Sequence, residues 1–496
     1  MFEAAISGLT QVFAFPTFFI MIIGMLIGLA IGIIPGLGGQ VTLALLLPTI
    51  YGMDPATALA FLLGAHAIVP TGGSITAILF NVPGTGQNVA TTLDGFPLTK
   101  QGQGGKALGA ALGASAIGGV IGAIFLMAII PIMRPLAFAL SAPEFFMLSL
   151  LGISFIASIG GGDVVKNLIA GGVGLLITFI GMDSGTGVPR YTFGQLYLWE
   201  GIKLIPAVIG LFAFAEMLAL AVKGGSLVEV QVQRLPALKD VIIGVWQVFR
   251  KFWLMVQTAL IGTLIGAVPG MGGDVANVFC YGFASKRSKQ PETFGKGNIE
   301  GVISAEAANN GKEGGALIPT LGFAVPGSAG MAILLGAFYL LGLQPGPLML
   351  KEKLDLVFLL AWTLAIANLI GGGICVLFSS WLARASFVRG SLLVPLILVL
   401  GMLGAFSATG HVGDLFVAFI FGLLGYGMMH FGYSRVTMLL GLVLGKVAEK
   451  NLTISLNAYG YSFWLRPISL ILLAIIIVGI AYPLFRKAHR RGDQTR

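Results

Sequence analysis

The sequence is poor in charge: Asp, Glu, Lys and Arg make up 10% of its 496 residues, whereas hydrophobic residues make up 56%. Soluble domains carry about 25% charged residues, so this chain cannot cover a globular surface with polar groups. Lipid must cover much of the molecule instead. Apolar runs that approach the roughly 20 residues needed to cross a bilayer recur at Thr17–Ile34, Ala107–Ile130, Val164–Gly181, Ile202–Val222, Leu354–Leu382, Leu392–Phe406, Val412–Met429 and Pro467–Leu484.

Backbone in lipid must be hydrogen-bonded internally, either in a helix or in a closed barrel. Barrel strands alternate apolar and polar residues, and these runs do not. With the shorter apolar pieces between them, they predict an all-α integral membrane protein of about 10–12 transmembrane helices. Lysines and arginines gather in a few loops and in the tail Phe485–Arg496, which the positive-inside rule places in the cytoplasm.

Cysteine and the common catalytic motifs are also scarce. Cys280 and Cys375 lie in apolar stretches, so we expect buried thiols and no disulfide framework. There is no His-Glu-x-x-His zinc site, no Gly-x-Ser-x-Gly nucleophile elbow and no Gly-x-x-x-x-Gly-Lys-Ser/Thr phosphate loop. The sequence therefore predicts no enzyme, no ATP-driven pump and no cofactor. It also has no basic surface with interleaved aromatic residues, so nucleic acid is not an expected partner.

Glycine, in contrast, is abundant: the 73 glycines are about twice the usual share of roughly 7%. Tight packing of membrane helices explains most of them, but not a pattern that occurs twice. Gly28-x-x-x-Gly32-x-x-Pro35-Gly36-Leu37-Gly38-Gly39 is matched by Gly262-x-x-x-Gly266-x-x-Pro269-Gly270-Met271-Gly272-Gly273. Further on, Gly72-Gly73 leads to Val82-Pro83-Gly84-Thr85, and Gly314-Gly315 leads to Val325-Pro326-Gly327-Ser328.

Two motifs in the same order indicate an internal repeat. We expect a first membrane repeat at 1–222, a linker with an interfacial helix at 223–251, a second repeat at 252–484 and a basic tail at 485–496. Charge placement predicts that the repeats are inverted. The loop Pro48–Thr57 has no Lys or Arg, whereas its counterpart Ser285–Asn298 has four; the loop Lys100–Lys106 is basic, whereas Lys351–Asp355 is balanced. Inverted repeats are typical of secondary transporters.

The paired motifs are the candidate site. Proline removes a helical hydrogen bond, so each Pro-Gly cluster should interrupt its span. The freed N–H groups favour an anion, and freed carbonyls can hold a cation. We interpret Thr71–Ser74 and Asn81–Thr85 as the arms of a re-entrant hairpin that is repeated in the second half. Tight helix packing is the alternative. The candidate substrate-binding residues are Pro35, Gly36, Gly38, Gly39, Gly72, Gly73, Ser74, Asn81, Pro83, Gly84, Thr85, Pro269, Gly270, Gly272, Gly273, Asn309, Asn310, Gly314, Gly315, Pro326, Gly327 and Ser328.

Ionisable residues inside a membrane are costly and are functional candidates by default. Asp274 directly follows the second Gly-Gly pair, and Glu306 precedes Asn309-Asn310. Both are candidate ligands of a coupling ion, Na⁺ or H⁺, and the alternative for each is a packing hydrogen bond or a loop position. For His66 we favour a packed histidine over a substrate ligand or a proton carrier. Asp94 and Lys100 are expected to order a cytoplasmic loop.

Several of these segments resemble one family, the TctA family, the large membrane subunit of the tripartite tricarboxylate transporters. The resemblance runs from about residue 20 to about residue 480. It rests on Gly28–Gly39, Gly72–Gly84, Leu93–Lys100, Phe294–Gly297, Glu300–Val302, Glu306–Asn310 and Gly314–Pro319.

The resemblance implies ion-driven import of carboxylates across the bacterial inner membrane. It also implies two partners, a small four-helix membrane subunit and a periplasmic substrate-binding protein. His66–Thr71 stands where such families often have aromatic residues, which leaves the identity of the carboxylate open. Our leading hypothesis is a secondary transporter of di- or tricarboxylates that works by alternating access. The alternatives are an organic-anion channel, which would show no trans-stimulation in counterflow, and a membrane-embedded enzyme.

Overall fold

The computed structural model describes residues 1–159, 163–183, 186–223, 235–269, 272–387 and 390–494. Within those ranges it does not describe the side chains of 155–159, 272, 274, 390–391 and 482–494. The chain is 81% helical, which confirms the all-α prediction. Cys280 and Cys375 are buried and free, as expected.

Two series of helices follow the same order. The first comprises α1 (Phe2–Phe13), α2 (Thr17–Gly32), α3 (Gly39–Leu46), η1 (Leu47–Ile50), α4 (Pro55–Phe80), η2 (Gly86–Asn88), α5 (Val89–Lys100) and α6 (Gly104–Phe138). The second comprises α11 (Leu238–Arg250), α12 (Phe252–Gly266), α13 (Gly272–Arg287), η5 (Pro291–Thr293), α14 (Ile299–Phe323), α15 (Ala329–Leu340), α16 (Pro347–Glu352) and α17 (Leu354–Leu377). Each series starts with a bent pair, at 69° between α1 and α2 and at 79° between α11 and α12.

Further helices follow each series. After the first come α7 (Ala142–Ile159), α8 (Val164–Ile177), the hairpin of β1 (Gly181–Met182) and β2 (Pro189–Arg190), η3 (Leu196–Leu198), α9 (Leu204–Val208), the π-helical η4 (Ile209–Phe214) and α10 (Ala215–Lys223). After the second come α18 (Ser379–Ala385), α19 (Gly390–Ser407), α20 (Gly413–Phe431), α21 (Arg435–Tyr459), η6 (Gly460–Leu465) and α22 (Pro467–Gln494).

Long apolar helices are fewer than the sequence predicted. Within the described ranges, five helices are long and apolar enough to cross a membrane, or up to eight if each bent pair is one span. The estimate of about 10–12 counted short apolar pieces as spans. The structure shows that several of these are short helices, such as the eight-residue α3. α14 is not among the long apolar helices because it carries buried charged side chains, yet nearly all of it is buried in the protein.

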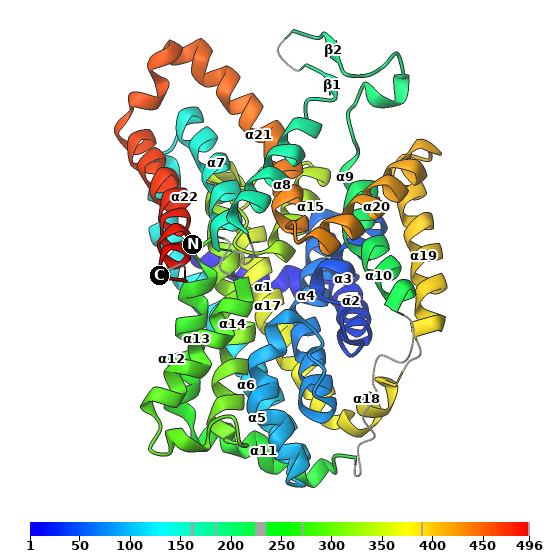
Figure 1. Ribbon diagram of the computed structural model, residues 1–496, viewed down its shortest axis with the longest axis vertical. Helices are drawn as coiled ribbons and strands as arrows, with labels where there is room; N and C mark the ends of the chain where they lie inside the picture. Colours follow the sequence, from blue (N-terminus) through cyan, green and yellow to red (C-terminus); the bar gives the residue numbers. More distant parts are fainter. Residues whose placement is uncertain (160–162, 184–185, 224–234, 270–271, 388–389, 495–496) are drawn as a thin grey trace.

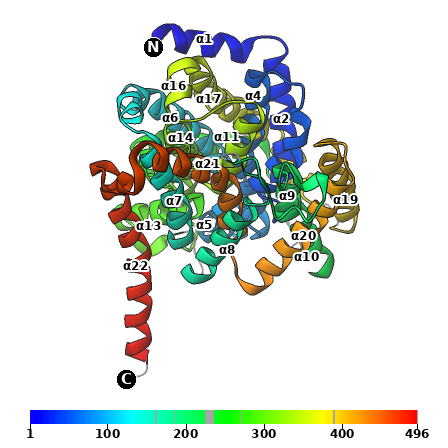
Figure 2. The same ribbon diagram turned by 90° about the horizontal axis from the view of Figure 1, so that it is seen from above.

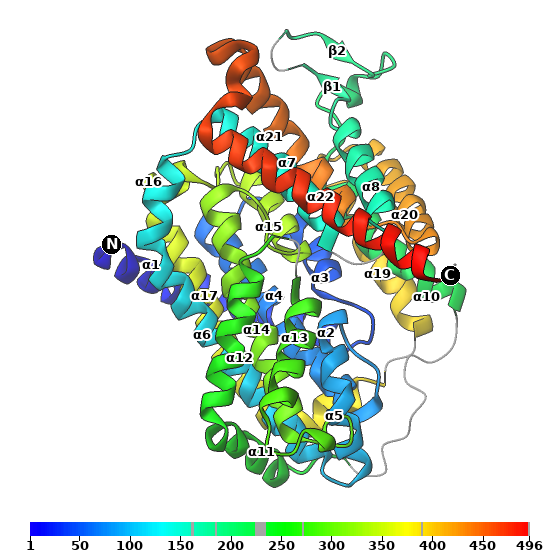
Figure 3. The same cartoon turned by 60° about the vertical axis from the view of Figure 1, so that its left-hand side comes forward.

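The molecule is elongated, with distinct ends (Figure 1). α5 and α11 lie at the lower end, whereas the β1–β2 hairpin and one end of α21 lie at the upper end. From above, α1 lies along the rim and α22 extends away from the body (Figure 2). Figure 3 shows α4, α14 and α13 in the middle and α22 slanting across the upper half. The core therefore consists of α4, α14 and the helices packed around them.

The two basic loops lie together at the lower end. Gln101 Nε2 donates to the carbonyl oxygen of Lys296 at 2.7 Å, so the loop after α5 contacts the loop after α13. The loops 48–57 and 351–355, which have no excess positive charge, both contact the bend between α1 and α2. Gln11 Nε2 donates to Asp355 Oδ2 at 2.7 Å, and the hydroxyls of Thr17 and Thr57 lie 2.8 Å apart. The two basic loops thus lie together, and so do the two loops without excess positive charge; the inversion of the repeats stays a prediction.

Glycines let the central helices approach closely. A Cβ on Gly28 or Gly32 of α2 would lie 2.2 or 2.5 Å from a carbonyl oxygen of α4. Gly266 of α12 has the same relation to α14, at 2.2 Å from the carbonyl oxygen of Lys312. Small residues at such crossings are how membrane helices pack. The packing alternative is therefore correct for these glycines of the repeated pattern.

Candidate functional site

The first Pro-Gly cluster interrupts the chain between α2 and α3, as predicted. Pro35 is buried, and Gly36 adopts φ +85°, a conformation that L-residues rarely adopt. The Gly36 N–H donates to the carbonyl oxygen of Gly84 at 3.1 Å, and the Gly84 N–H donates to that of Gly73 at 3.4 Å. Gly38 and Gly39 then begin α3. The two motifs of the first half are therefore joined through their backbones.

The second Pro-Gly cluster lies between α12 and α13. α12 ends at Gly266, Pro269 is half-buried, and α13 begins at Gly272. Gly270 lies outside the described residues. The side chain of Asp274 also lies outside them, so its predicted role as an ion ligand stays a prediction. Gly273 is buried, and a Cβ there would lie 2.6 Å from Gln87 and 2.8 Å from Lys312.

The re-entrant hairpins are built differently from the expectation. Thr71–Ser74 lies inside the unbroken helix α4, and Gly314 and Gly315 lie inside α14. Each of these helices ends in a residue of left-handed conformation, Asn81 (φ 59°) and Ala324 (φ 55°). The chain then doubles back along its own helix before α5 or α15 begins. Gly73 and Ala316 thus face the returning segments, whereas Gly72 packs against α2, Gly314 against α6 and Gly315 against α12, so the Gly-Gly pairs are not arms of a hairpin.

Close contacts also fix the correspondence between the halves. A Cβ on Gly84 would lie 2.3 Å from the Cα of Gly73, and one on Gly327 would lie 2.6 Å from the Cα of Ala316. Gly73 therefore corresponds to Ala316, one residue beyond the Gly-Gly pair. This explains why the spacing between the motifs differs by one residue in the sequence.

The polar residues of the second motifs cap and brace these turns. Ser328 Oγ accepts from the N–H of Met331 at 3.3 Å and caps α15. Thr85 Oγ1 donates to Asn88 Oδ1 at 2.8 Å. Pro326 and Gly327 are buried, Pro83 is half-buried and Asn81 is exposed.

Glu306 lies in a buried network that joins four elements. Its Oε1 accepts from Asn88 at 3.2 Å and from Thr91 at 2.5 Å, and its Oε2 accepts from Ser115 at 2.8 Å and from Asn309 at 3.2 Å. These donors come from η2, α5, α6 and α14. Asn88 also donates to Ser74 Oγ at 3.2 Å and to the carbonyl oxygen of Pro70 at 3.0 Å. Two predicted residues, Ser74 and Asn309, thus belong to this Glu306 network.

Asn310 makes a separate link. Its amide donates to Thr71 Oγ1 at 2.8 Å and to Asn368 Oδ1 at 2.5 Å. This contact joins α14 to α4 and to α17.

A second group of buried ionisable side chains lies at the middle of α4 and α14. We call His66, Lys312 and Glu313 the central triad. Lys312 Nζ lies 2.6 Å from Glu313 Oε1, and His66 Nε2 lies 3.4 Å from the same oxygen. Their relative exposures are 4%, 1% and 0% for His66, Lys312 and Glu313. Within the described residues these polar atoms make close ionic contacts but no well-directed hydrogen bonds. Buried polar atoms without hydrogen bonds mark a place where a further partner can bind.

Helix starts from both halves surround the central triad. A Cβ on Gly39, the first residue of α3, would lie 2.6 Å from His66 Nδ1. One on Gly330, at the start of α15, would lie 2.2 Å from His66 Cε1. Gly273, at the start of α13, has the same relation to Lys312. The predicted backbone breaks therefore meet at the central triad, whose side chains are not among the candidate substrate-binding or ion-binding residues.

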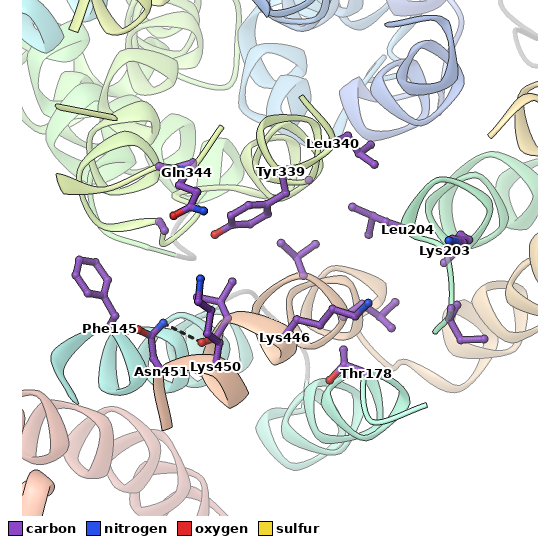
Figure 4. Close-up of a pocket in the computed structure, with 18 of the residues that line it drawn as sticks. Phe145, Thr178, Lys203, Leu204, Tyr339, Leu340, Gln344, Lys446, Lys450 and Asn451 are labelled. Carbon is purple, nitrogen blue, oxygen red and sulfur yellow. Dashed lines mark hydrogen bonds between the residues drawn. The ribbon is translucent and has the colours of Figure 1, made fainter. Parts of the chain in front are cut away.

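A cavity of about 700 Å³ lies above the centre, between α15 and α21 (Figure 4). We call it the outer pocket. It is bordered by three lysines, of which Lys203 is paired with Glu200. A hydrogen bond from Lys203 lowers the pKa of the Glu200 carboxyl, which keeps Glu200 negative. The lining includes Phe145, Thr178, Glu200, Lys203, Leu204, Ala324, Tyr339, Leu340, Gln344, Lys446, Lys450 and Asn451.

α15 connects the outer pocket to the central triad. Its first turn contacts His66, whereas its last turn, with Tyr339 and Leu340, lines the pocket. The separation along the helix from Gly330 to Tyr339 is about 14 Å. The pocket also reaches Ala324, the residue at which α14 ends.

A model of the tripartite tricarboxylate transporter TctA family matches residues 18–440. The chain belongs to this family. An uncharacterized 52.8 kDa protein in the TAR-I ttuC' 3' region of Agrobacterium vitis is 31% identical over 502 residues, covering 100% of this chain and 97% of that protein. An uncharacterized protein in the TAR-II ttuC' 3' region of the same organism is 30% identical over 238 residues, covering 47% of this chain and 98% of that protein. No solved structure matches significantly.

The TctA family is a membrane component of a tripartite transport system, which agrees with the apolar helices of this chain. Within the described residues no group of three or more His, Cys, Asp or Glu side chains could hold a metal ion. In this TctA-family protein, sequence reasoning missed Lys312 and Glu313. The signal was present, because a Lys-Glu pair between two glycines lies inside a buried helix.

Proposed function

We propose that this protein is the large transmembrane subunit of a binding-protein-dependent secondary transporter that imports di- or tricarboxylate anions by cation symport. One substrate carboxylate binds at the central triad, and the protein alternates between an outward-open and an inward-open state. The family supports transport, and the geometry of the centre supports an anion as the cargo.

The observation that carries the proposal is the position of Lys312. Its side chain is 1% exposed at the meeting point of the backbone breaks. The starts of α3, α13 and α15 point partial positive charge at this centre. A buried ammonium group and helix N-termini together favour a carboxylate, which accepts hydrogen bonds from ammonium and N–H groups.

The distribution of charge supports an orientation. The basic loops after α5 and α13 lie together at the lower end (Figure 1), so we place that end in the cytoplasm of a bacterial inner membrane. The tail 485–496 is assigned to the cytoplasm by its own charge. The pairing of the loops supports two inverted repeats, 1–222 and 252–484, joined by the linker 223–251. α11 supplies the interfacial helix, although 224–234 lie outside the described residues.

In this orientation the outer pocket faces the periplasm. It is placed to receive a carboxylate from a periplasmic binding protein and to pass it along α15 to the centre. A small four-helix membrane subunit completes the assembly. A Na⁺ or H⁺ gradient supplies the energy. Glu306 is one candidate ligand of the coupling ion, but its two oxygens already accept four hydrogen bonds.

The test is counterflow in proteoliposomes that contain the three-component system. Vesicles loaded with unlabelled citrate, succinate or tartrate are diluted into the labelled anion. A secondary transporter shows transient accumulation of label, whereas an anion channel does not. Absence of accumulation for every anion would contradict the proposal, and accumulation that survives Lys312→Met would contradict the assigned site.

A further inference from the structure

We propose that the central triad is the proton-coupling site of this transporter, and that Glu313 binds the carboxylate substrate's accompanying proton. The inference rests on the proposed function. It assigns the coupling ion as H⁺ and the coupling group as Glu313, in place of Asp274 or Glu306.

The first step is competition for Lys312. In the structure the Lys312 ammonium is paired with the Glu313 carboxylate at 2.6 Å, so its charge is already compensated. A substrate carboxylate that arrives next to this pair adds a second negative charge to a buried site. In surroundings of low dielectric constant, a buried ionisable group avoids such excess charge by taking up a proton. A proton on Glu313 neutralises it and leaves Lys312 to the substrate.

The second step is the route of the proton. His66 Nε2 lies 3.4 Å from Glu313 Oε1, the start of α3 lies against Nδ1, and the start of α15 lies against Cε1 and Nε2. An imidazole ring has two nitrogens, each of which can donate or accept a proton, so it can pass a proton from one side of the ring to the other. His66 therefore connects Glu313 to the backbone breaks. The proton moves from solvent on the outer side to His66 and then to Glu313 as substrate binds. After the change to the inward-open state it leaves Glu313 through His66 to the cytoplasm, together with the substrate.

In the described part of the chain, no further charged side chain lies next to Glu313. Its charged neighbours are Lys312 on α14 and His66 on α4. α6 and α12 approach this part of α14 with Gly122 and Gly266. α13 approaches Lys312 with Gly273, and the next residue is Asp274, whose side chain is not described. The test therefore includes Asp274.

Glu306 provides the contrast on the same helix. It accepts four hydrogen bonds from neutral donors in four elements, so both of its oxygens already have partners. Glu313 has one cation and one imidazole as neighbours and no well-directed hydrogen bond within the described residues. Of these two buried carboxylates, Glu313 is the one whose surroundings change when Lys312 takes another partner.

The experiment uses the three-component system in proteoliposomes and whichever of citrate, succinate or tartrate gives counterflow. Accumulation of this anion is driven either by a pH gradient or by a Na⁺ gradient. We expect the pH gradient to drive accumulation in the wild type. In Glu313→Gln, a permanent mimic of the protonated group, we expect the pH gradient to lose its effect and exchange to become independent of pH. Comparison of the two proteins removes the contribution of the anion's own titration.

Three results would overturn the inference. They are a wild type driven by Na⁺ and not by pH, a Glu313→Gln protein still driven by pH, and loss of the pH effect in Asp274→Asn with retention in Glu313→Gln. If the wild type exchanges none of the anions, the proposed function itself fails. If the Glu313→Gln variant misfolds, infrared difference spectra of the wild type still test the inference. Binding of the anion should produce a protonated-carboxyl band that Glu306→Gln retains, and its absence would overturn the inference.

Discussion

The centre of the molecule and the outer pocket hold lysines in opposite settings. Lys312 is buried, packed against glycines and paired with Glu313. Lys446 and Lys450 border a cavity of about 700 Å³ and are exposed. A mobile, exposed ammonium attracts anions over a range that salt screens, whereas a buried one must always be compensated. The centre is thus suited to selective binding and the pocket to capture.

The contrast predicts that changes in the centre have large effects. Glu306→Ala, in the Glu306 network on the same helix as Lys312, should have the largest effect on stability. Thr91, Ser115 and Asn309 lose the acceptor of their hydrogen bonds, and Asn88 loses one of its three acceptors. We expect a loss of about 1–3 kcal/mol in the free energy of unfolding for each buried donor that is left unsatisfied. Thermal unfolding in detergent measures it. Glu352→Ala removes an exposed carboxylate on α16 and should change nothing; equal stability of the two variants would contradict the role of the Glu306 network.

Gly330→Ala tests whether His66 must keep its place. The new Cβ would lie 2.2 Å from His66 Cε1, so the ring or α15 must shift. Overpacking of this kind costs about 1–3 kcal/mol of stability, and we expect uptake to fall because the ring is displaced from Glu313. The matched control is Gly282→Ala on α13, where no atom lies within 4 Å. Uptake reduced equally in both variants would show that the contact with His66 has no specific importance.

Asp94→Asn tests whether the contacts of Asp94 hold the lower end of the molecule closed while the outer pocket is open. Asp94 accepts from the N–H groups of Gly297 and Asn298 at 2.8 Å each, and from the Tyr281 hydroxyl at 2.9 Å. Hydrogen bonds to charged groups contribute about 1.5–3 kcal/mol. Their loss should favour the inward-open state.

The measurement for Asp94→Asn is thiol labelling from the cytoplasmic side. The reporter is Gln87→Cys in a background without Cys280 and Cys375, because Gln87 lies beside Gly273 at the centre. We expect faster labelling in Asp94→Asn, whereas Glu292→Gln, an exposed carboxylate at the same end, should leave the rate unchanged. An unchanged rate in Asp94→Asn would exclude a closing function for these contacts.

Lys450→Met should have the smallest effect. Exposed charges contribute about 0.2–1 kcal/mol, so the KM for the carboxylate should rise by up to about 5-fold with kcat unchanged. The effect should disappear at high salt. Lys353→Met, an exposed lysine outside the pocket, is the control. A large fall in kcat would place the outer pocket in the transport step itself.

The predicted features that the structure reproduces are those set by local chemistry. Pro35 and Gly36 interrupt the chain because proline cannot donate a helical hydrogen bond and glycine tolerates φ +85°. The spacing of Gly28 and Gly32 indicated close helix contact, and both lie against backbone of α4. None of these conclusions requires knowledge of tertiary contacts.

The centre could not be predicted in full because it depends on contacts between distant segments. His66 was interpreted as a packed histidine, since nothing near it in the sequence indicates Glu313, 247 positions further on. Gly72 and Gly73, within Thr71–Ser74, were expected to lie in one arm of a re-entrant hairpin. They remain helical, because neighbouring backbone fills the space that side chains would occupy. The missed pair Lys312-Glu313 was visible in the sequence, but its role requires the packing of α4 on α14.

The most direct test of the account compares Lys312→Met with Lys446→Met. Both substitutions remove one ammonium group, at the centre in the first and at the outer pocket in the second. The measurement is counterflow of the identified carboxylate in proteoliposomes at saturating concentration. The account predicts that Lys312→Met abolishes exchange and that Lys446→Met retains it. Retained exchange in Lys312→Met with loss in Lys446→Met would contradict the account and assign the substrate site to the outer pocket.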